Sequence, residues 1–373
     1  MRLRHLTAWP QAESERTALR VAWQRLLQRC TPVSIFQTFE WHEAWWTTFG
    51  HGCELHLLLV EDDVGLRAIA PFVIETRPGL WRAQRCLTLL GTRNHASDYA
   101  DVIVPRGDTQ AAQAVLDWVI ANPVDWHSLQ LENIPGDSPT LARYAEHAAL
   151  PQTLLQFAAA APARRLGDAA ENRALLQKKS LRRHVNGFRR DGGVALRRLR
   201  EPAEIDAHLE GLFEQHCRRW ANTPTPSLFN DPQQREFYRA VAARLDPESE
   251  LNFSVVLWRD APIAYHFGFE RDGVFTWYKP SFEPSLAKRS PGEVLLALLF
   301  EDAIERGLRE FDFTVGDESF KYRFANIERQ VYRLRVYRHL SARLPALARH
   351  TLKRWIRRSP HGAPSAAGTH PDH

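Results

Sequence analysis

One succession of elements occurs twice along this chain, in residues 54–132 and again in residues 253–315. Each stretch predicts three strands joined by short turns, then a helix, then a further strand. The two stretches share the order of their elements but hardly any residue identities. Three antiparallel strands followed by a crossover helix and another strand describe half of a mixed α/β sheet. The recurrence therefore predicts a duplicated domain, with two related, mainly antiparallel sheets flanked by helices.

The length of 373 residues is sufficient for two such domains, each with its own core. We expect an N-terminal domain over residues 1–160 and a C-terminal domain over residues 171–340. Residues 151–170 are rich in Ala and Pro and follow no clear pattern, so we interpret them as a connection. Residues 341–373 predict a basic C-terminal helix followed by a disordered tail.

Composition excludes several classes of protein. The net charge of +5 is a mild excess that does not by itself imply nucleic-acid binding. The four cysteines are scattered without CxxC spacing, which argues against a zinc site or a disulfide framework. No metal cluster, phosphate-binding loop or dinucleotide fingerprint is evident. No secretory signal and no bilayer-spanning apolar run is recognisable, so we expect a cytoplasmic location.

The stretch from Tyr278 to Phe324 contains the clearest helix start in the chain. Ser290 is a favourable N-cap, and Pro291 suits the first helical position. Glu293 completes a Ser-x-x-Glu capping box. Gly307 is expected to end the helix in a left-handed conformation. The pattern therefore predicts a helix from Pro291 that packs against the second sheet.

The turn before this helix has the composition of an anion site. Lys288 and Arg289 precede the free N–H groups of the first helical turn, which attract anions together with the helix dipole. Gly292 permits a close approach to the backbone. We therefore predict that Lys288, Arg289, Ser290 and Gly292 bind a phosphate. The alternative is a well-capped structural helix with two solvated cations, which the carboxylate of Glu293 favours because it would compete with a phosphate.

A second basic segment, residues 172–190, predicts a helix rich in Lys and Arg. Such a run forms either a solvated helix face or a clamp for phosphate or another acidic group. The spacing alone does not distinguish these two interpretations.

Three segments carry a resemblance to a known family: FQTFEWHEAWWTTFG, ASDYADVIV and above all FTWYKPSFEPSLAKRSPGEVLLALLFEDAIERGLREFDFTVGDESFKYRF. They resemble the GNAT-superfamily acyltransferases of the CelD type, which are bacterial proteins often described as polysaccharide or cellulose biosynthesis acetyltransferases. The resemblance covers roughly residues 34–338. It implies a double GNAT fold related to the Fem peptidyltransferases, with acyl-CoA as the donor and no metal.

In a GNAT domain, the pyrophosphate of the cofactor lies on the first turn of the central helix. The usual signature there is Gln/Arg-x-x-Gly-x-Gly/Ala. This chain offers Arg289-Ser290-Pro291-Gly292-Glu293-Val294, which matches at Arg289 and Gly292 and departs at Val294.

Acyl transfer to an amine needs a base and a proton donor for the leaving thiolate. We predict Tyr278 as that donor and Asp312 as a base or orienting acid, with Asp317 and His266 as further candidates near the substrate. Lys321 lies where the resembling families keep a lysine near the substrate. The alternatives are that Asp312 only ties down a loop, that His266 is a buried strand residue, and that Lys321 is a surface lysine in a turn.

We expect the acceptor to bind where loops meet the rigid scaffold. Tyr99 and Asp101 lie in a polar loop, and Trp220 ends a helix before another loop. These three residues and Lys321 are predicted to line one cleft.

The sequence as a whole predicts transfer of an acyl group from acyl-CoA to an amine or hydroxyl of an envelope or polysaccharide-related acceptor. One alternative is a Fem-like transferase that uses aminoacyl-tRNA, in which residues 172–190 would contact RNA; no other nucleic-acid partner is expected. Another is a non-catalytic scaffold in envelope assembly. Residues 340–358 could give peripheral contact with the inner membrane face.

Overall fold

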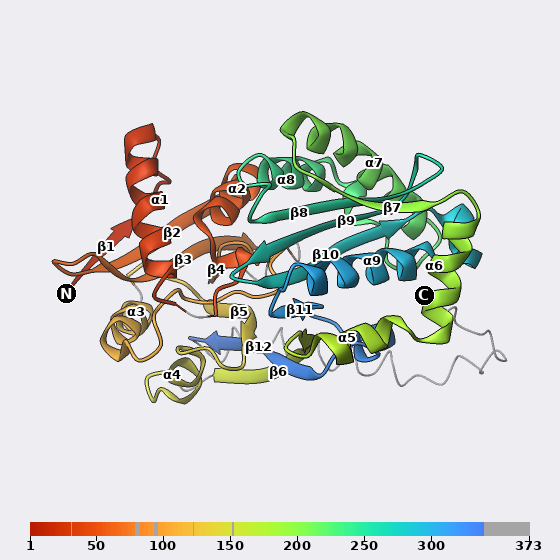
Figure 1. Ribbon diagram of the computed structural model, residues 1–373. Helices are drawn as coiled ribbons and strands as arrows, with labels where there is room; N and C mark the ends of the chain where they lie inside the picture. Colours follow the sequence, from red (N-terminus) through yellow and green to blue (C-terminus); the bar gives the residue numbers. More distant parts are fainter. Residues whose placement is uncertain (31, 79–82, 93–95, 122, 151–152, 339–373) are drawn as a thin grey trace, which may run out of the picture. The chain divides into compact units, whose positions relative to one another are not determined.

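The computed structural model describes residues 1–30, 32–78, 83–92, 96–121, 123–150 and 153–338. These residues form two compact units. The first unit contains Met1–Ala159 and the chain that begins at Gln330, and the second contains Ala160–Arg329. Figure 1 shows the elements of both.

The first unit is built on a mainly antiparallel sheet. Its strand order is β1-β2-β3-β4-β5-β12, in which only β4 and β5 are parallel neighbours. The strands are β1 (Arg2–Leu6), β2 (Cys53–Glu61), β3 (Leu66–Arg77), β4 (Gln84–Leu89), β5 (Ser128–Pro135) and β12 (Ile327–Tyr337). The helices are α1 (Glu13–Leu27), η1 (Ile35–Gln37), α2 (Phe39–Phe49), α3 (Thr109–Ala121) and α4 (Leu141–Glu146).

The second unit has a sheet of the same kind. Its strand order is β7-β8-β9-β10-β11-β6, and only β10 and β11 are parallel neighbours. The strands are β7 (Val194–Leu199), β8 (Leu251–Trp258), β9 (Ala261–Arg271), β10 (Val274–Phe282), β11 (Glu310–Asp312) and β6 (Thr153–Arg165), which belongs to this unit from Ala160 on. The helices are α5 (Ala169–Leu176), α6 (Lys179–Arg190), α7 (Pro202–Trp220), η3 (Leu228–Asn230), α8 (Pro232–Ala242), η4 (Pro284–Arg289), α9 (Pro291–Glu305) and α10 (Ser319–Tyr322).

The two units repeat one topology. In each, a pair of α-helices follows the first strand, three antiparallel strands come next, and a crossover helix leads to a parallel strand. An antiparallel strand from elsewhere in the chain completes each sheet, β12 in the first and β6 in the second. The prediction of a mixed α/β fold with mainly antiparallel sheets and flanking helices is confirmed.

The connection between the units differs from the expectation. Residues 153–165 form strand β6, which pairs with β11, where the sequence suggested a connection without pattern. Alanine has a low strand propensity, so pairing with distant parts of the chain rather than the local sequence favours this conformation. From Gln330 the chain lies with the first unit, whereas the sequence placed everything up to residue 340 in the C-terminal domain. The predicted C-terminal helix and tail, and the membrane contact over 340–358, lie outside the described residues.

Helices cover both faces of the second sheet (Figure 1). Helix α9 packs on one face in a core with strands β9, β10 and β11. On the opposite face, Tyr238 of α8 contacts Phe267 of β9, and His208 of α7 hydrogen-bonds Tyr265 of β9 at 3.1 Å. A side chain of this sheet can therefore be assigned to the α9 face or to the α7/α8 face.

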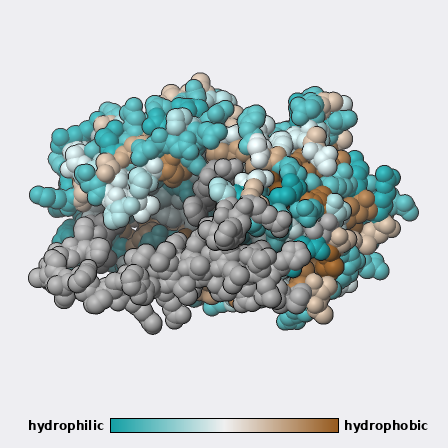
Figure 2. Space-filling view, turned by 180° about the vertical axis from the view of Figure 1, so that it is seen from behind, coloured by the Kyte–Doolittle hydropathy of each residue, from teal (hydrophilic) through white to brown (hydrophobic). Residues whose placement is uncertain are grey.

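No helix in the described part of the chain has the length and apolar character to cross a bilayer. Figure 2 shows hydrophilic residues over much of the coloured surface on one side of the molecule, with hydrophobic residues in smaller areas between them.

Candidate functional site

The two parallel strands of the second sheet stay together for only a short distance. Strand β10 pairs with β11 over three residue pairs, the last of which is Thr276–Asp312. Strand β11 ends at Asp312, but β10 continues to Phe282. The register of β10 against β9 also shifts between Thr276 and Lys279, which is typical of a β-bulge. The far part of β10 therefore extends past the end of its parallel neighbour.

One edge of this extension faces away from β9. The N–H of Glu283 donates to the carbonyl of Ile263 at 2.9 Å, so residue 283 points toward β9. Because backbone groups alternate in direction along an antiparallel strand, the carbonyl of Pro280 points the opposite way. We call the edge of residues 278–282 that faces away from β9 the β10 edge. It presents backbone groups beyond the end of β11.

The corresponding position in the first unit is filled by the chain itself. Strands β4 and β5 also pair over only three residues on each side. Beyond them, the N–H of Ala100 donates to the carbonyl of Asn133, and the Asn133 amide donates to the carbonyl of Ser97. The start of α3 is occupied as well, since Asp108 caps Ala111 and binds Arg67 through two hydrogen bonds of 2.7 and 2.8 Å. A site for the acyl donor is therefore expected in the second unit.

The start of α9 differs from the predicted capping box. Ser290 has a left-handed backbone conformation, with φ of 56°, and its side chain makes no cap hydrogen bond. Its carbonyl instead accepts the N–H groups of Glu293 and Val294. The 3₁₀-helix η4 runs directly into Ser290 and determines this conformation, which residue identity did not reveal. Pro291 at the first helical position and left-handed Gly307 after the helix are confirmed.

Arg289 turns away from the helix start, which corrects the prediction that it points toward the N–H groups of residues 292–294. Its guanidinium donates to a carboxylate oxygen of Asp191 at 2.7 Å and to the carbonyl of Gly187 at 3.2 Å. It also lies over the rings of Phe188 and Trp258, at 4.2 and 4.6 Å from their centroids. Arg289 thus links η4 to the end of α6 through these contacts. Lys288 is exposed on η4.

The first turn of α9 already holds an ion-pair network. Glu293 binds His184 of α6 at 2.7 Å and Arg323 at 2.6 Å. Burial alone would raise the pKa of Glu293, but Arg323 and His184 outweigh it and hold this pKa below its usual value. Gly292 packs against Phe282, whose ring carbon would lie 3.1 Å from a Cβ added at Gly292. A carboxylate of the chain thus lies where the sequence predicted a pyrophosphate.

Tyr278 and Asp312 lie on the α7/α8 face of the sheet. The rings of Phe275 and Phe311 stack at 4.5 Å on the α9 face, so Asp312, the next residue in β11, points the other way. The hydroxyl of Tyr278 receives a hydrogen bond from Tyr238 of α8 at 3.0 Å. Asp312 accepts the N–H of Thr314 at 2.7 Å and therefore also ties down the loop after β11. Two of the predicted catalytic groups thus share one face.

His266 lies on the α9 face and behaves as a strand residue. Its ring stacks with Phe275 and Trp277, with centroids 5.2 and 4.8 Å away. Nε2 accepts the N–H of Tyr278 at 3.2 Å. Burial lowers the pKa of His266 to about 3, so the imidazole stays neutral and is a poor base. The arrangement favours the structural interpretation of this residue.

Lys321 is buried and holds the loop that follows β11. Its ammonium donates to the carbonyl of Val315 at 3.0 Å and pairs with Glu318 at 2.8 Å. Only 3 % of the residue is exposed, so it is not a surface lysine. Asp317, in the same loop, is exposed.

The predicted acceptor residues belong to different units. Asp101 is buried in the first unit, where it accepts a hydrogen bond from Thr140 at 2.9 Å. Tyr99 is half-buried in the same loop, with its ring 6.1 Å from that of Phe36. Trp220 is half-buried at the end of α7 in the second unit. A common cleft for Tyr99, Asp101, Trp220 and Lys321 stays a prediction.

Sequence analysis did not identify Arg219. Its guanidinium donates to the carbonyl of Pro280 at 3.2 Å and lies 4.2 Å from the ring centroid of Phe282. It therefore reaches the β10 edge. The adjacent Arg218 has the same residue type, and no local pattern distinguishes the two.

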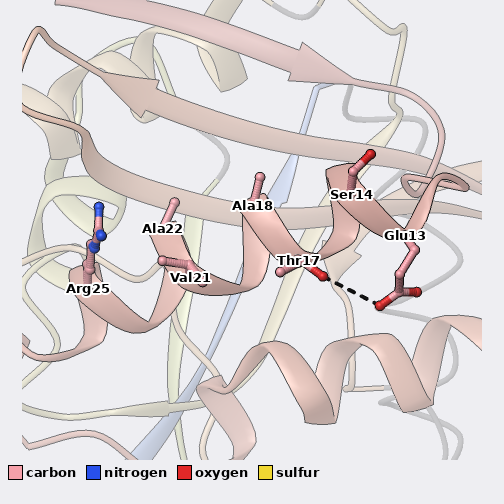
Figure 3. Close-up of a pocket in the computed structure, with 7 residues that line it drawn as sticks. All are labelled: Glu13, Ser14, Thr17, Ala18, Val21, Ala22 and Arg25. Carbon is pink, nitrogen blue, oxygen red and sulfur yellow. Dashed lines mark hydrogen bonds between the residues drawn. The ribbon is translucent and has the colours of Figure 1, made fainter.

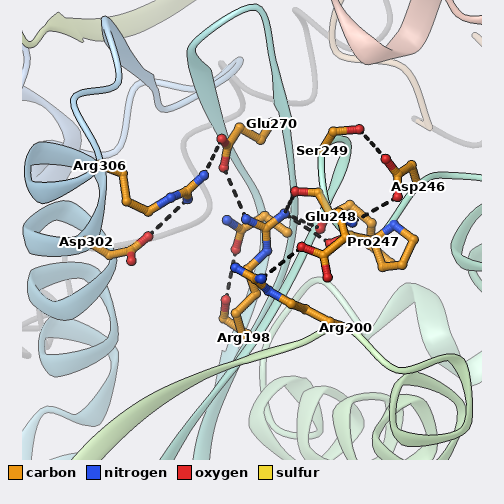
Figure 4. Close-up of polar contacts among 12 residues, drawn as sticks. Arg198, Arg200, Asp246, Pro247, Glu248, Ser249, Glu270, Asp302 and Arg306 are labelled. Carbon is orange, nitrogen blue, oxygen red and sulfur yellow. Dashed lines mark hydrogen bonds and ion pairs between the residues drawn. The ribbon is translucent and has the colours of Figure 1, made fainter.

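Two other features are structural. At the far end of the second sheet, Arg198 donates to the carbonyls of Pro247, Glu248 and Leu251, each at 3.1 Å, and lies 3.6 Å from Glu270, which also binds Arg306 (Figure 4). In the first unit, an open hollow runs along α1 (Figure 3). It is lined by Glu13, Ser14, Thr17, Ala18, Val21, Ala22 and Arg25, all from one helix. The described residues include no group of three or more His, Cys, Asp or Glu placed to hold a metal.

Comparison with known families gives a match in the second unit. Residues 176–322 match the family model described as "Acetyltransferase (GNAT) domain". This range contains β7 to β11 and α9, so the site described above lies within the segment that matches this family model. No curated protein matches the chain.

Several solved structures share the fold over nearly the whole chain. FemX is 11% identical with a TM-score of 0.59, and the match covers 90% of this chain and 97% of that one. The C-terminal domain of a putative lysylphosphatidylglycerol synthetase from Agrobacterium fabrum is 13% identical with a TM-score of 0.53, covering 88% and 97%. L-PGS from Bacillus licheniformis is 13% identical with a TM-score of 0.52, covering 86% and 97%. At these identities the likeness concerns the fold.

Proposed function

We propose that the second unit transfers an acyl group, such as acetyl, from acyl-CoA to an amine or hydroxyl of an envelope or polysaccharide-related acceptor. The observation that carries this proposal is the β10 edge, in a domain that matches the GNAT family model. An exposed strand edge can bind an extended chain through main-chain hydrogen bonds. The pantetheine arm of CoA is such a chain and carries two amide groups. The first unit fills the corresponding position with its own loop, which supports assigning the reaction to the second.

Tyr278 is the proposed proton donor. Attack by the acceptor on the thioester carbonyl creates an oxyanion, for which the N–H of Phe282 on the β10 edge is a suitable donor, because Pro280 has no N–H and that of Tyr278 donates to His266. Collapse of this intermediate expels the CoA thiolate, which takes the proton of the Tyr278 hydroxyl, while Asp312 on the same face takes the proton that the acceptor loses. Proton exchange with solvent then restores both groups. Tyr238, at 3.0 Å, can donate a hydrogen bond to the resulting phenolate. Asp312 would orient the acceptor from the same face, and Lys321 supports the adjacent loop. A CoA-dependent reaction fits the expected cytoplasmic location.

A second candidate function is aminoacyl transfer from tRNA, as in the Fem-like alternative. The ion pairs of Glu293 at the start of α9 favour it, because a pyrophosphate would have to displace or repel this carboxylate. Helix α6 buries Leu181, Val185 and Phe188 and exposes a row of cations that suits a polyanion. These cations are Lys178, Lys179, Arg182, Arg183, Arg189 and Arg190.

Binding and turnover of acetyl-CoA test the first proposal. Calorimetry measures binding, and a thiol reagent follows CoA release with amino sugars as acceptors. We expect Tyr278→Phe to lower kcat by roughly a hundredfold with acetyl-CoA affinity unchanged, since a lost general acid affects the chemical step. Tyr322→Phe, an exposed tyrosine of α10, is the matched control and should act like wild type.

The alternatives give different results. Salt-dependent binding of aminoacyl-tRNA without binding of acetyl-CoA would replace the first proposal with the second. If neither donor binds, the domain is a scaffold. If Tyr278→Phe turns over at the wild-type rate, the assignment of the proton donor is wrong.

A further inference from the structure

Arg219 is a half-buried cation without an anionic partner in the part of the chain that the structure describes. The carboxylate of Glu283, at the end of β10, is bound by the adjacent Arg218 at 3.0 Å. Burial lowers the pKa of Arg219 to about 10, and no acidic residue opposes this shift. A cation taken out of water without a counter-ion destabilises the protein unless a ligand supplies the anion.

The position of Arg219 is defined by its contacts at the β10 edge. Helix α7 lies on the face opposite α9, yet the guanidinium donates to Pro280, whose carbonyl faces away from β9. It also lies over the ring of Phe282, and that ring packs on Gly292 in the first turn of α9. The side chain therefore reaches past β10 to the edge that β11 leaves open. The guanidinium ends one aromatic ring away from the start of α9.

Two further groups near this position carry a hydrogen-bond donor or a positive charge. The indole Nε1 of Trp220 is shielded from solvent and has no hydrogen-bond partner among the described residues. Lys279 lies in β10 next to Pro280, and its ammonium is 4.0 Å from the ring centroid of Tyr278. Burial first, and then the charges of Arg219 and Lys279, lower the pKa of the nearby His216 to about 3. Both cations thus act on one neutral imidazole, and the guanidinium of Arg219 with the unpartnered indole N–H of Trp220 suits an oxyanion.

We propose that Arg219, with Trp220 and Lys279, binds a phosphate group of a substrate at the β10 edge. This inference rests on the proposed function in one respect, namely that substrates reach this edge. The planar guanidinium matches a phosphate through two parallel hydrogen bonds, which an ammonium cannot make. The phosphate belongs either to the donor, as the pyrophosphate of CoA, or to the acceptor. In the first case Arg219 takes the role that the sequence assigned to Arg289.

Calorimetry with inorganic pyrophosphate tests the site directly. Arg219→Met should weaken pyrophosphate binding roughly ten- to a hundredfold, the effect of one charge-assisted contact. Arg219→Lys should fall between this variant and wild type. Arg218→Met removes the neighbouring arginine of α7 and should bind pyrophosphate like wild type. Melting temperatures of all variants check the fold, and Arg219→Met should melt no lower than wild type because it removes a buried charge.

Two acyl donors, acetyl-CoA and S-acetylpantetheine, distinguish the source of the phosphate. If it belongs to CoA, Arg219→Met weakens acetyl-CoA but not S-acetylpantetheine, which has no phosphate. If it belongs to the acceptor, the variant weakens pyrophosphate alone. Equal binding of pyrophosphate by Arg219→Met and wild type, or no binding by wild type, would overturn the inference. If the wild type does not bind acetyl-CoA but binds pyrophosphate in a way that depends on Arg219, only the acyl-CoA proposal would be overturned.

Discussion

Asp101 offers a quantitative test of the first unit. Its carboxyl is buried, and burial raises its pKa from 3.8 to about 6, against the hydrogen bonds from Ser138, Thr140 and the N–H of Val102. Because the pKa is higher in the folded than in the unfolded chain, the folded protein retains the proton more strongly. This contribution to stability is complete below about pH 4 and is lost as the pH rises through about 6.

The magnitude follows from the size of the shift. A pKa difference of about two units corresponds to about 3 kcal/mol lost at pH 7.5 relative to the fully protonated state. At pH 4.5 the loss is only about 1 kcal/mol, which leaves a change of about 2 kcal/mol between these two pH values. Asp101→Asn cannot ionise, and its amide oxygen can still accept from Thr140 and Val102. The stability of the variant relative to wild type should therefore rise by about 2 kcal/mol over this interval.

Urea unfolding followed by tryptophan fluorescence, at pH values from about 4.5 to 7.5, measures this difference. Asp117→Asn removes an exposed carboxylate of α3 in the same unit and is the matched control, with no pH-dependent difference from wild type expected. If the stabilities of Asp101→Asn and wild type run parallel with pH, Asp101 is ionised in the folded protein and the reasoning from burial is wrong.

Three further predictions concern the second unit. Arg289→Ala should bind acetyl-CoA within about twofold of wild type, because the guanidinium is directed to the end of α6; a tenfold loss by calorimetry would restore its predicted role. Arg198→Met should lower the free energy of unfolding by about 2–4 kcal/mol, because three carbonyls and Glu270 lose a hydrogen-bond donor. Urea unfolding measures this change, and a loss below about 1 kcal/mol would refute the estimate. Gly316→Ala should cost about 2 kcal/mol in the same assay, because Gly316 has φ of 136° and a Cβ there would lie 2.7 Å from the Lys321 ammonium. Unchanged stability would mean that this loop relaxes freely.

Much of the fold could be predicted because local sequence patterns indicate its strands, turns and helix ends. The hairpins of 253–282 follow from alternating strand residues and short turns, and helix α9 from its apolar run, Pro291 and Gly307. Strand β6 could not be recognised, since alanine has a low strand propensity and contacts distant in the chain, such as the pairing of Ala163 with Asp312 of β11, are not visible in the sequence. The basic segment 172–190 is two helices, α5 and α6, rather than one.

The candidate site was predictable in residue type but not in contacts. Tyr278 and Asp312 lie on one face because strand periodicity determines which residues share a face. The partner of Arg289 is Asp191, 98 residues earlier, and no local pattern indicates such a pair. The same holds for Arg218 and Arg219, which adjoin in sequence but bind a carboxylate and a strand edge respectively.

Strand β12 has a consequence for the order of events during synthesis. It joins β5 across a large separation in the chain, as the contact between Arg333 and Glu132, 201 residues apart, illustrates. A ribosome delivers β5 first and then the entire second unit before β12 emerges. Until then, one edge of β5 exposes unpaired backbone groups, which readily recruit other chains. Domains usually fold from the N-terminus onward. Here the unit that is translated first is completed last, so its sheet keeps an open edge while the second unit is being synthesised.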